Sequence, residues 1–307
     1  MSDEANEGIL NRAEAITSAA QHYGPQIELL RQITNYGTNL ILRAYNSSSR
    51  GLTDVVVCAV LLKQVVEMID AVQVLVEAGS THAAYLPARA GLEASIYVDW
   101  ILFSEPDKKA KCYIVGNYRE EALWARRAIR GTEERAAINK LSKSLGMDWS
   151  AIKDETEVLA RNRLEEVKRV LAQKELESID NEYTKLRKNR KRDVEWYELL
   201  GVKSLRQVAQ QVGRLLEYEV FYAKGSKITH SSSYAHHIGF EGEEVAIRHI
   251  RHLLDMHEIM HCVVALSMNT YRSVIRYYRI GELAALNRKY VEEWRQPFQS
   301  TRKVVYT

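Results

Sequence analysis

Cysteine is scarce in this sequence of 307 residues, and the three that occur, Cys58, Cys112 and Cys262, lie far apart. None of them forms a Cys-x-x-Cys pair, which argues against a structural zinc site built on thiolates, and their odd number argues against a disulfide framework. The N-terminal residues are acidic where a secretion signal would be basic and then apolar. We therefore expect a protein of the reducing cytoplasm.

An excess of one charge is also missing, because 43 Lys and Arg face 40 Asp and Glu, for a net charge of +3. Any nucleic-acid binding must then come from a local patch and not from the field of the whole protein. Uninterrupted apolar runs are missing as well. The most apolar stretch, 55–76, contains Lys63, Glu67 and Asp70, which are costly in a bilayer. We expect a core helix there and no membrane partner.

Proline and glycine, which punctuate helices, number only four and fifteen. The intervals between them are long, and no alternation with the strand period of two persists. We predict helices at 5–22, 25–46, 53–78, 81–103, 107–130, 133–145, 149–187, 204–224, 242–279 and 282–295. The expected fold class is therefore all-α, a multi-helix bundle.

The segment 149–193 is charged along most of its length, with a thin apolar line, and it ends in a basic run. This pattern is typical of a solvated helical arm followed by a linker. We predict a single helical bundle domain formed by residues 1–148 and 194–307, with the charged arm inserted between them. The basic run is either a solvated linker or a patch for nucleic-acid phosphates. Its members are Lys185, Arg187, Lys188, Arg190, Lys191 and Arg192.

A charged pair lies in the apolar helix predicted at 81–103. Arg89 and Glu93 are four residues apart and share a helix face, and Pro87 removes one backbone hydrogen bond just before them. A kinked helix that presents such a pair inside an apolar segment indicates a site. A buried ion pair that joins two helices would leave the same pattern.

Four side chains recur at four-residue steps in Tyr218-x3-Tyr222-x3-Ser226-x3-His230. On a helix they form one polar and aromatic stripe. Histidine is the usual proton carrier at neutral pH, and Ser226 is placed to position it. The alternative is a helix end at which Ser and His satisfy backbone groups.

Histidine is concentrated between residues 248 and 261. His257-Glu258-x-x-His261 matches the zincin pattern, in which two histidines one turn apart bind zinc and the glutamate is the general base. Glu282 would be a distant third ligand. Because the chain offers no clear strand to hold a peptide beside that helix, we favour no metal, and zinc is the alternative cofactor.

The same predicted helix carries Arg251 and His257, an arginine followed after a short gap by a histidine, as in the HEPN superfamily of small helical ribonucleases. Such a pair suits metal-free RNA cleavage, since arginine stabilises the phosphorane charge while histidine moves the proton of the 2′-hydroxyl. The gap is one residue longer than in most members of that superfamily. On a straight helix it turns the two side chains about 120° apart.

Three of these features together resemble a bacterial helical family known as domain of unknown function 5677. They are the helix of Arg89 and Glu93, Trp196 at the opening of a helical segment, and the stripe from Tyr218 to His230. The likeness covers roughly residues 50–235. It implies a helical prokaryotic domain in the company of defence or toxin systems, where HEPN-like helical effectors are common, and it implies no established activity.

The leading hypothesis is a HEPN-like effector of a prokaryotic defence or toxin system that binds or cleaves RNA. His230, Arg251 and His257 would carry protons and stabilise charge, and Arg89 and Glu93 would orient them. The alternatives are a zinc-dependent hydrolase and a non-catalytic module that binds nucleic acid or a partner protein from the same operon. Long apolar helix faces favour a homo-oligomer, although no heptad run specifies one.

Overall fold

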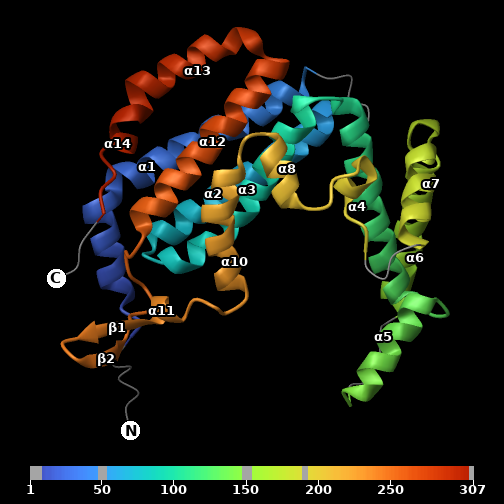
Figure 1. The fold of residues 1–307 in the computed structure, drawn as a ribbon, viewed down its shortest axis with the longest axis horizontal. Coiled ribbons are helices and arrows are strands. Elements are labelled where there is room, and N and C mark those ends of the chain that lie inside the picture. Colours follow the sequence, from blue (N-terminus) through green and yellow to red (C-terminus); the bar gives the residue numbers. More distant parts are fainter. Residues whose placement is uncertain (1–8, 48–53, 147–153, 189–192, 304–307) are drawn as a thin grey trace. The chain divides into compact units, whose positions relative to one another are not determined.

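A computed structural model of the chain describes residues 9–47, 54–146, 154–188 and 193–303. Most of these residues are helical, and the strands among them form one two-stranded antiparallel hairpin (Figure 1). The predicted all-α multi-helix bundle is therefore confirmed. Across the described ranges, every helix is too short or too polar to cross a lipid bilayer.

Internal contacts divide the chain into two compact units. The first consists of Met1–Gly51, Val55–Ser104 and Leu205–Thr307, and the second of Leu52–Asp54 and Glu105–Ser204. The segment that interrupts the first unit thus begins near residue 105, earlier in the chain than the predicted arm at 149–193.

The first unit is built around three long helices, α1 (Arg12–Tyr45), α3 (Thr81–Phe103) and α12 (Met256–Tyr278). Both α1 and α3 pack against α12, and α2 (Asp54–Glu77) adds a further, mostly apolar helix. The break predicted between 22 and 25 is wrong, because α1 runs through Pro25. Its apolar positions stay in helical register on both sides of that proline, so the buried face is continuous.

The chain from 205 to 237 is a series of short helices. It comprises α8 (Leu205–Gln211), α9 (Leu215–Glu217), a π-helical turn η2 (Tyr218–Tyr222), α10 (Ala223–Thr229) and α11 (Tyr234–His237). α10 and η2 pack on α3. A π-turn inside a helical segment is uncommon and is often found at functional sites.

The helix predicted at 242–279 is wrong in its first part. A hairpin of β1 (Ile238–Glu241) and β2 (Glu244–Ile247) occupies that place, and α12 starts only at Met256. Gly242 takes the left-handed conformation that the tight turn requires (φ 65°). Asp255 is also left-handed (φ 62°), so no helix continues through it.

The C-terminal part of the first unit folds back along the bundle. η3 (Ile280–Glu282), α13 (Leu283–Lys289), a second π-turn η4 (Tyr290–Trp294) and α14 (Arg295–Gln299) follow α12. α14 packs against α1. Trp294 is fully buried and donates from its indole nitrogen to Gln32 at 3.2 Å. This contact holds the C-terminal segment against α1.

The second unit is organised around α4 (Pro106–Ala128), which packs against α5 (Glu133–Ser144), α6 (Asp154–Leu171), α7 (Lys174–Lys188) and the 3₁₀ turn η1 (Trp196–Leu200). The helix predicted at 149–187 is thus two helices. The thin apolar line of the charged segment is buried, since Val167, Leu176 and Tyr183 have little exposed surface.

Candidate functional site

Arg89 on α3 connects this helix to η2 and α10. Its Nη2 donates to the phenolic oxygen of Tyr222 at 2.8 Å, and its Nη1 donates to the hydroxyl of Thr229 at 3.0 Å. The guanidinium carbon also lies 4.4 Å from the centre of the Tyr222 ring, within cation–π range. Arg89 therefore holds the ring of Tyr222 in one orientation.

Arg89 and Glu93 do not form the predicted charged pair. Glu93 instead accepts a hydrogen bond from the hydroxyl of Tyr97 at 3.1 Å. The two residues share a helix face as predicted, but the guanidinium turns to α10, where the hydroxyl of Thr229 and the ring of Tyr222 are in reach.

The close approach of α10 to α3 depends on Gly225. A Cβ atom at this position would lie 2.8 Å from the Cβ of Arg89 and 3.1 Å from the carbonyl oxygen of Tyr85. Real Cβ atoms do not approach other atoms so closely without displacing them. The glycine thus brings the stripe of α10 against the Arg89 side chain.

The stripe predicted from sequence spacing lines a single open depression of about 260 Å³. The lining residues are Tyr218, Tyr222, Ala223, Ser226, Lys227, His230 and Ser232. The two tyrosine rings are stacked, with centroids 4.7 Å apart and an interplanar angle of 16°. His230 is exposed and forms the C-cap of α10. An aromatic pair, a cation and an imidazole therefore face the same small volume.

Burial raises the pKa of the Tyr218 phenol, and the neighbouring Tyr222 and Glu219 act in the same direction. The phenol therefore stays protonated at neutral pH and is available as a hydrogen-bond donor. Lys224 lies in the first turn of α10. Burial would lower its pKa, but the carboxylates of Asp255 and Glu258, at 2.9 and 2.7 Å from its Nζ, raise it.

The residues of the zincin-like motif are engaged separately. Glu258 accepts from Lys224, His261 lies 3.2 Å from the carbonyl oxygen of Phe298, and Glu282 pairs with Arg43 and Arg279. In the parts of the chain that the structure covers, no three His, Cys, Asp or Glu side chains are grouped to hold a metal ion. The base and the third ligand of the predicted zinc site, Glu258 and Glu282, are therefore each paired with a cation.

Arg251 does not lie on the helix that carries His257, so the helical relationship assumed for this pair is wrong. Arg251 belongs to the loop before α12 and donates from Nη1 to the carbonyl oxygen of Ala78 at 3.1 Å. His257 lies in the first turn of α12, and burial lowers its pKa. A guanidinium that is hydrogen-bonded to a backbone carbonyl is poorly placed to stabilise the charge on a reacting phosphate.

A cluster of histidines packs beside this loop. The ring of His82 lies 5.0 Å from the rings of both His236 and His237. Burial lowers the pKa of His252 to about 4, helped by Arg248 and by neighbouring histidines. The Nδ1 atom of His252 accepts a hydrogen bond from the backbone N–H of Leu254 at 3.2 Å, as a neutral imidazole can.

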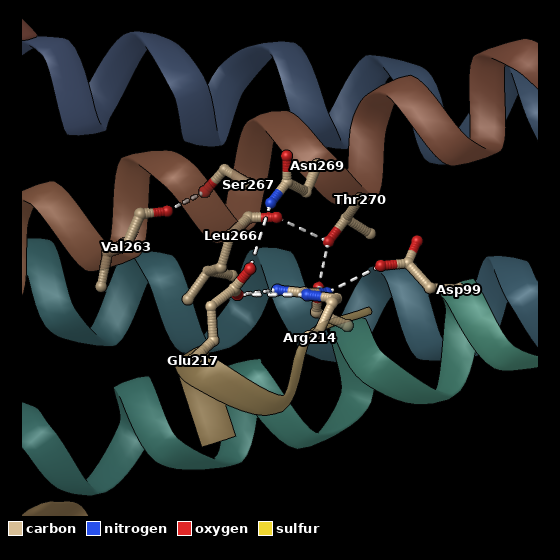
Figure 2. Close-up of polar contacts among 9 residues, drawn as sticks. Asp99, Arg214, Glu217, Val263, Leu266, Ser267, Asn269 and Thr270 are labelled. Atoms are coloured by element: carbon tan, nitrogen blue, oxygen red, sulfur yellow. Dashed lines mark hydrogen bonds and ion pairs between the residues drawn. The ribbon is translucent and has the colours of Figure 1, made fainter. Parts of the chain in front are cut away.

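A second polar site, which the sequence pattern did not reveal, is centred on Arg214, the residue before α9 (Figure 2). The arginine side chain is only 6% exposed. Its Nη1 donates to Asp99 at 2.8 Å and to Ser95 at 2.5 Å, and its Nε and Nη2 both donate to Glu217. The hydroxyls of Ser95 and Thr270 are 2.6 Å apart, which extends the network to α12.

An open depression of about 680 Å³ lies against this network. Its walls combine apolar, aromatic, basic and acidic side chains from α3, the turn before α9, and α12. The residues are Asp99, Leu102, Phe103, Val212, Gly213, Arg214, Glu217, Asn269, Arg272, Ser273, Arg276 and Tyr277. Cations and carboxylates from three distant stretches of chain thus meet here.

The predicted basic patch falls only partly within the described residues. Lys185, Arg187 and Lys188 form the last turn of α7, and the last two line a depression of about 300 Å³ together with Arg119. Arg187 lies 3.8 Å from Asp193. The remaining three members, Arg190, Lys191 and Arg192, lie outside the described residues.

These features define a predominantly helical protein with two polar sites on its larger unit. The model of a family of unknown function, DUF5677, matches residues 55–245, which is more than half of the chain, and the protein belongs to this family. The match includes Arg89, Trp196 and the stripe up to His230, and it ends before Arg251 and α12. No curated protein and no solved structure matches the chain.

Proposed function

We propose that the protein binds single-stranded RNA at the depression lined by Tyr218, Tyr222, Lys227 and His230, and that it cleaves RNA there without a metal ion. One observation carries the proposal: a stacked tyrosine pair and an exposed imidazole line the same volume. The family match supplies no activity, so the chemistry is argued from these side chains alone.

Recognition would depend on stacking and charge. Single-stranded RNA is bound mainly by aromatic side chains that stack on unpaired bases and by cations that follow the backbone. Tyr218 and Tyr222 supply the aromatic surface, and Lys227 supplies a cation on the same helical segment. A depression of about 260 Å³ is suited to a single base and its phosphate and not to a duplex.

The proposed reaction uses His230 as the proton carrier. Its imidazole takes the proton of a 2′-hydroxyl, the 2′ oxygen forms a bond to phosphorus, and the 5′ oxygen leaves with a proton from water, which gives a 2′,3′-cyclic phosphate. Lys227 and the neutral phenol of Tyr218 stabilise the charge on the phosphoryl oxygens. Arg89 is a positioning residue, because it acts through Tyr222.

In this proposal the cell would use the activity as a defence- or toxin-type effector. Arg251 and His257 take no part in it, since the first is bound to a backbone carbonyl and lies off the helix that carries the second. A non-catalytic module that binds RNA through the same tyrosines is the second candidate, and the stacked pair supports it as well.

The test uses the full chain and a fluorescently labelled single-stranded RNA of about 12 nucleotides, which spans one typical binding site. We expect His230→Gln to lower the cleavage rate by about 10²- to 10⁴-fold, as expected for loss of a general base. Its affinity should change by less than about threefold, because stacking is intact. The matched control is His249→Gln, an exposed histidine outside the depression.

The outcomes of this test distinguish a metal-independent ribonuclease from an RNA-binding module. Binding without cleavage in the native protein selects the interaction module. Equal cleavage by the native protein and by His230→Gln contradicts the catalytic role, and absence of RNA binding contradicts the whole proposal. Cleavage that stops in EDTA contradicts the metal-independent reaction. Growth arrest by the native chain, but not by His230→Gln, supports an effector role.

A further inference from the structure

The Arg214 depression retains hydrogen-bonding groups that the protein itself does not use. Arginine has five N–H donors, and four of those on Arg214 have acceptors on Ser95, Asp99 and Glu217. The second carboxylate oxygen of Asp99, Oδ1, is buried and has no donor among the described residues. Figure 2 shows this oxygen turned away from Arg214. A buried acceptor without a partner is costly and normally has a donor.

Two further arginines stand at the rim of the depression, one helical turn apart on α12. Arg276 is exposed and has no carboxylate partner in the described chain. The guanidinium of Arg272 lies 5.7 Å from the ring of Tyr290, and it forms no ion pair with the carboxylates that the structure describes. Arginines at i and i+4 on one helix face are well placed to hold a phosphate or diphosphate group.

Apolar surface completes the depression. Phe103 and Tyr277, which are 68% and 49% exposed, line it with aromatic surface. The volume of about 680 Å³ falls in the range of pockets that take small organic ligands. Inorganic anions would leave this aromatic surface unused.

We infer that the Arg214 depression is a binding site for a nucleotide whose base carries an exocyclic amine, distinct from the RNA depression. Arg272 and Arg276 hold its phosphates, Phe103 and Tyr277 contact the base, and a base amine donates to the free oxygen of Asp99. Arg214 is a positioning residue that orients Asp99. The two sites share no lining residue, so the inference stands independently of RNA cleavage.

The experiment is calorimetric titration of the full chain with ADP and GDP, with adenosine and guanosine as their nucleoside halves, and with inorganic pyrophosphate as the diphosphate half. We expect at least one of the nucleotides to bind, and each half to bind at least about tenfold more weakly. The double variant Arg272→Gln/Arg276→Gln should bind the nucleotide at least about tenfold more weakly, the loss expected for one charge-assisted contact. Arg288→Gln, an exposed arginine on α13, is the matched control.

Four results would overturn the inference: no binding of ADP or GDP at millimolar concentration, equal binding of pyrophosphate and the nucleotide, undiminished binding by the double variant, or equal loss in Arg288→Gln. Thermal unfolding of each variant verifies that it is folded. The His230→Gln protein separates the two proposals, because it should bind the nucleotide like the native chain while losing RNA cleavage.

Discussion

Arg214 donates to the carboxylate of Asp99 at 2.8 Å across 115 positions of sequence. The pair connects the turn before α9 to α3. Hydrogen bonds of Ser95 to Arg214 and to Thr270 extend this connection to α12. Burial alone would lower the pKa of Arg214, but Glu217 and Asp99 raise it, so the guanidinium remains charged. A charge held in this way stabilises the fold only while its partners are present.

We predict that Arg214→Ala lowers the free energy of unfolding by about 3 to 5 kcal/mol, because it leaves Asp99 buried without its counter-ion. Urea denaturation measures the change. The matched control is Arg206→Ala, since Arg206 pairs with Glu219 at the surface with side chains 53% and 45% exposed. That variant should lose less than about 1 kcal/mol. Equal effects of the two substitutions would contradict the structural role of Arg214.

Two glycine substitutions should have opposite effects. Gly225→Ala forces a Cβ atom against Arg89 and Tyr85 and should destabilise the protein by about 1 to 3 kcal/mol. Gly281→Ala, in η3 with nothing within 4 Å of the new atom and without a left-handed φ, should stabilise it by about 0.4 to 1 kcal/mol. Thermal unfolding reports both. A neutral Gly225→Ala would show that α10 and α3 do not approach as described, and destabilisation by Gly281→Ala would show that the space beside residue 281 is filled.

The histidine cluster predicts a pH dependence of stability. The pKa of His252 is lowered to about 4 in the folded protein, from 6.5, chiefly by burial. The unfolded state therefore binds more protons between these values, and stability should fall as pH decreases from 6.5 towards 4. The loss between pH 7 and 5 should be on the order of 1 to 2 kcal/mol after allowance for partial solvent exposure.

His252→Asn should flatten this part of the pH profile. The asparagine oxygen can still accept from the N–H of Leu254, as the imidazole does, but it does not titrate. Urea denaturation at pH 7, 6 and 5 provides the measurement, with His249→Asn as the control on an exposed histidine of the same loop. An unchanged slope in His252→Asn would show that other groups cause the acid sensitivity.

Loss of the stacked tyrosine pair should weaken RNA binding. Tyr222→Leu removes one ring and the phenol to which Arg89 donates, and it should cost about 1 to 3 kcal/mol of binding free energy. Tyr222→Phe keeps the ring and should lose less. Fluorescence anisotropy at constant salt measures both. Tyr234→Leu, which removes a tyrosine that is 72% exposed outside the depression, is the control and should bind normally.

Local sequence patterns were sufficient for four consecutive helices of this protein. α2, α3, α4 and α5 begin and end within about two residues of their predicted bounds, because apolar spacing and helix breaks act over a few residues. The stripe from Tyr218 to His230 was visible for the same reason. The hairpin at 238–247 was missed because its strands are short and the histidine-rich stretch after it suggested one long helix.

The sequence by itself determined that the chain is helical and that four side chains on one segment share a face, since both follow from the 3.6-residue helical period. Only the tertiary structure decided which distant groups meet. It turned Arg89 from Glu93 towards Tyr222, separated Arg251 from α12, and brought Arg214 to Asp99. Ion pairs between remote residues have no local signature, because their free energy arises only after packing has removed water and placed both partners.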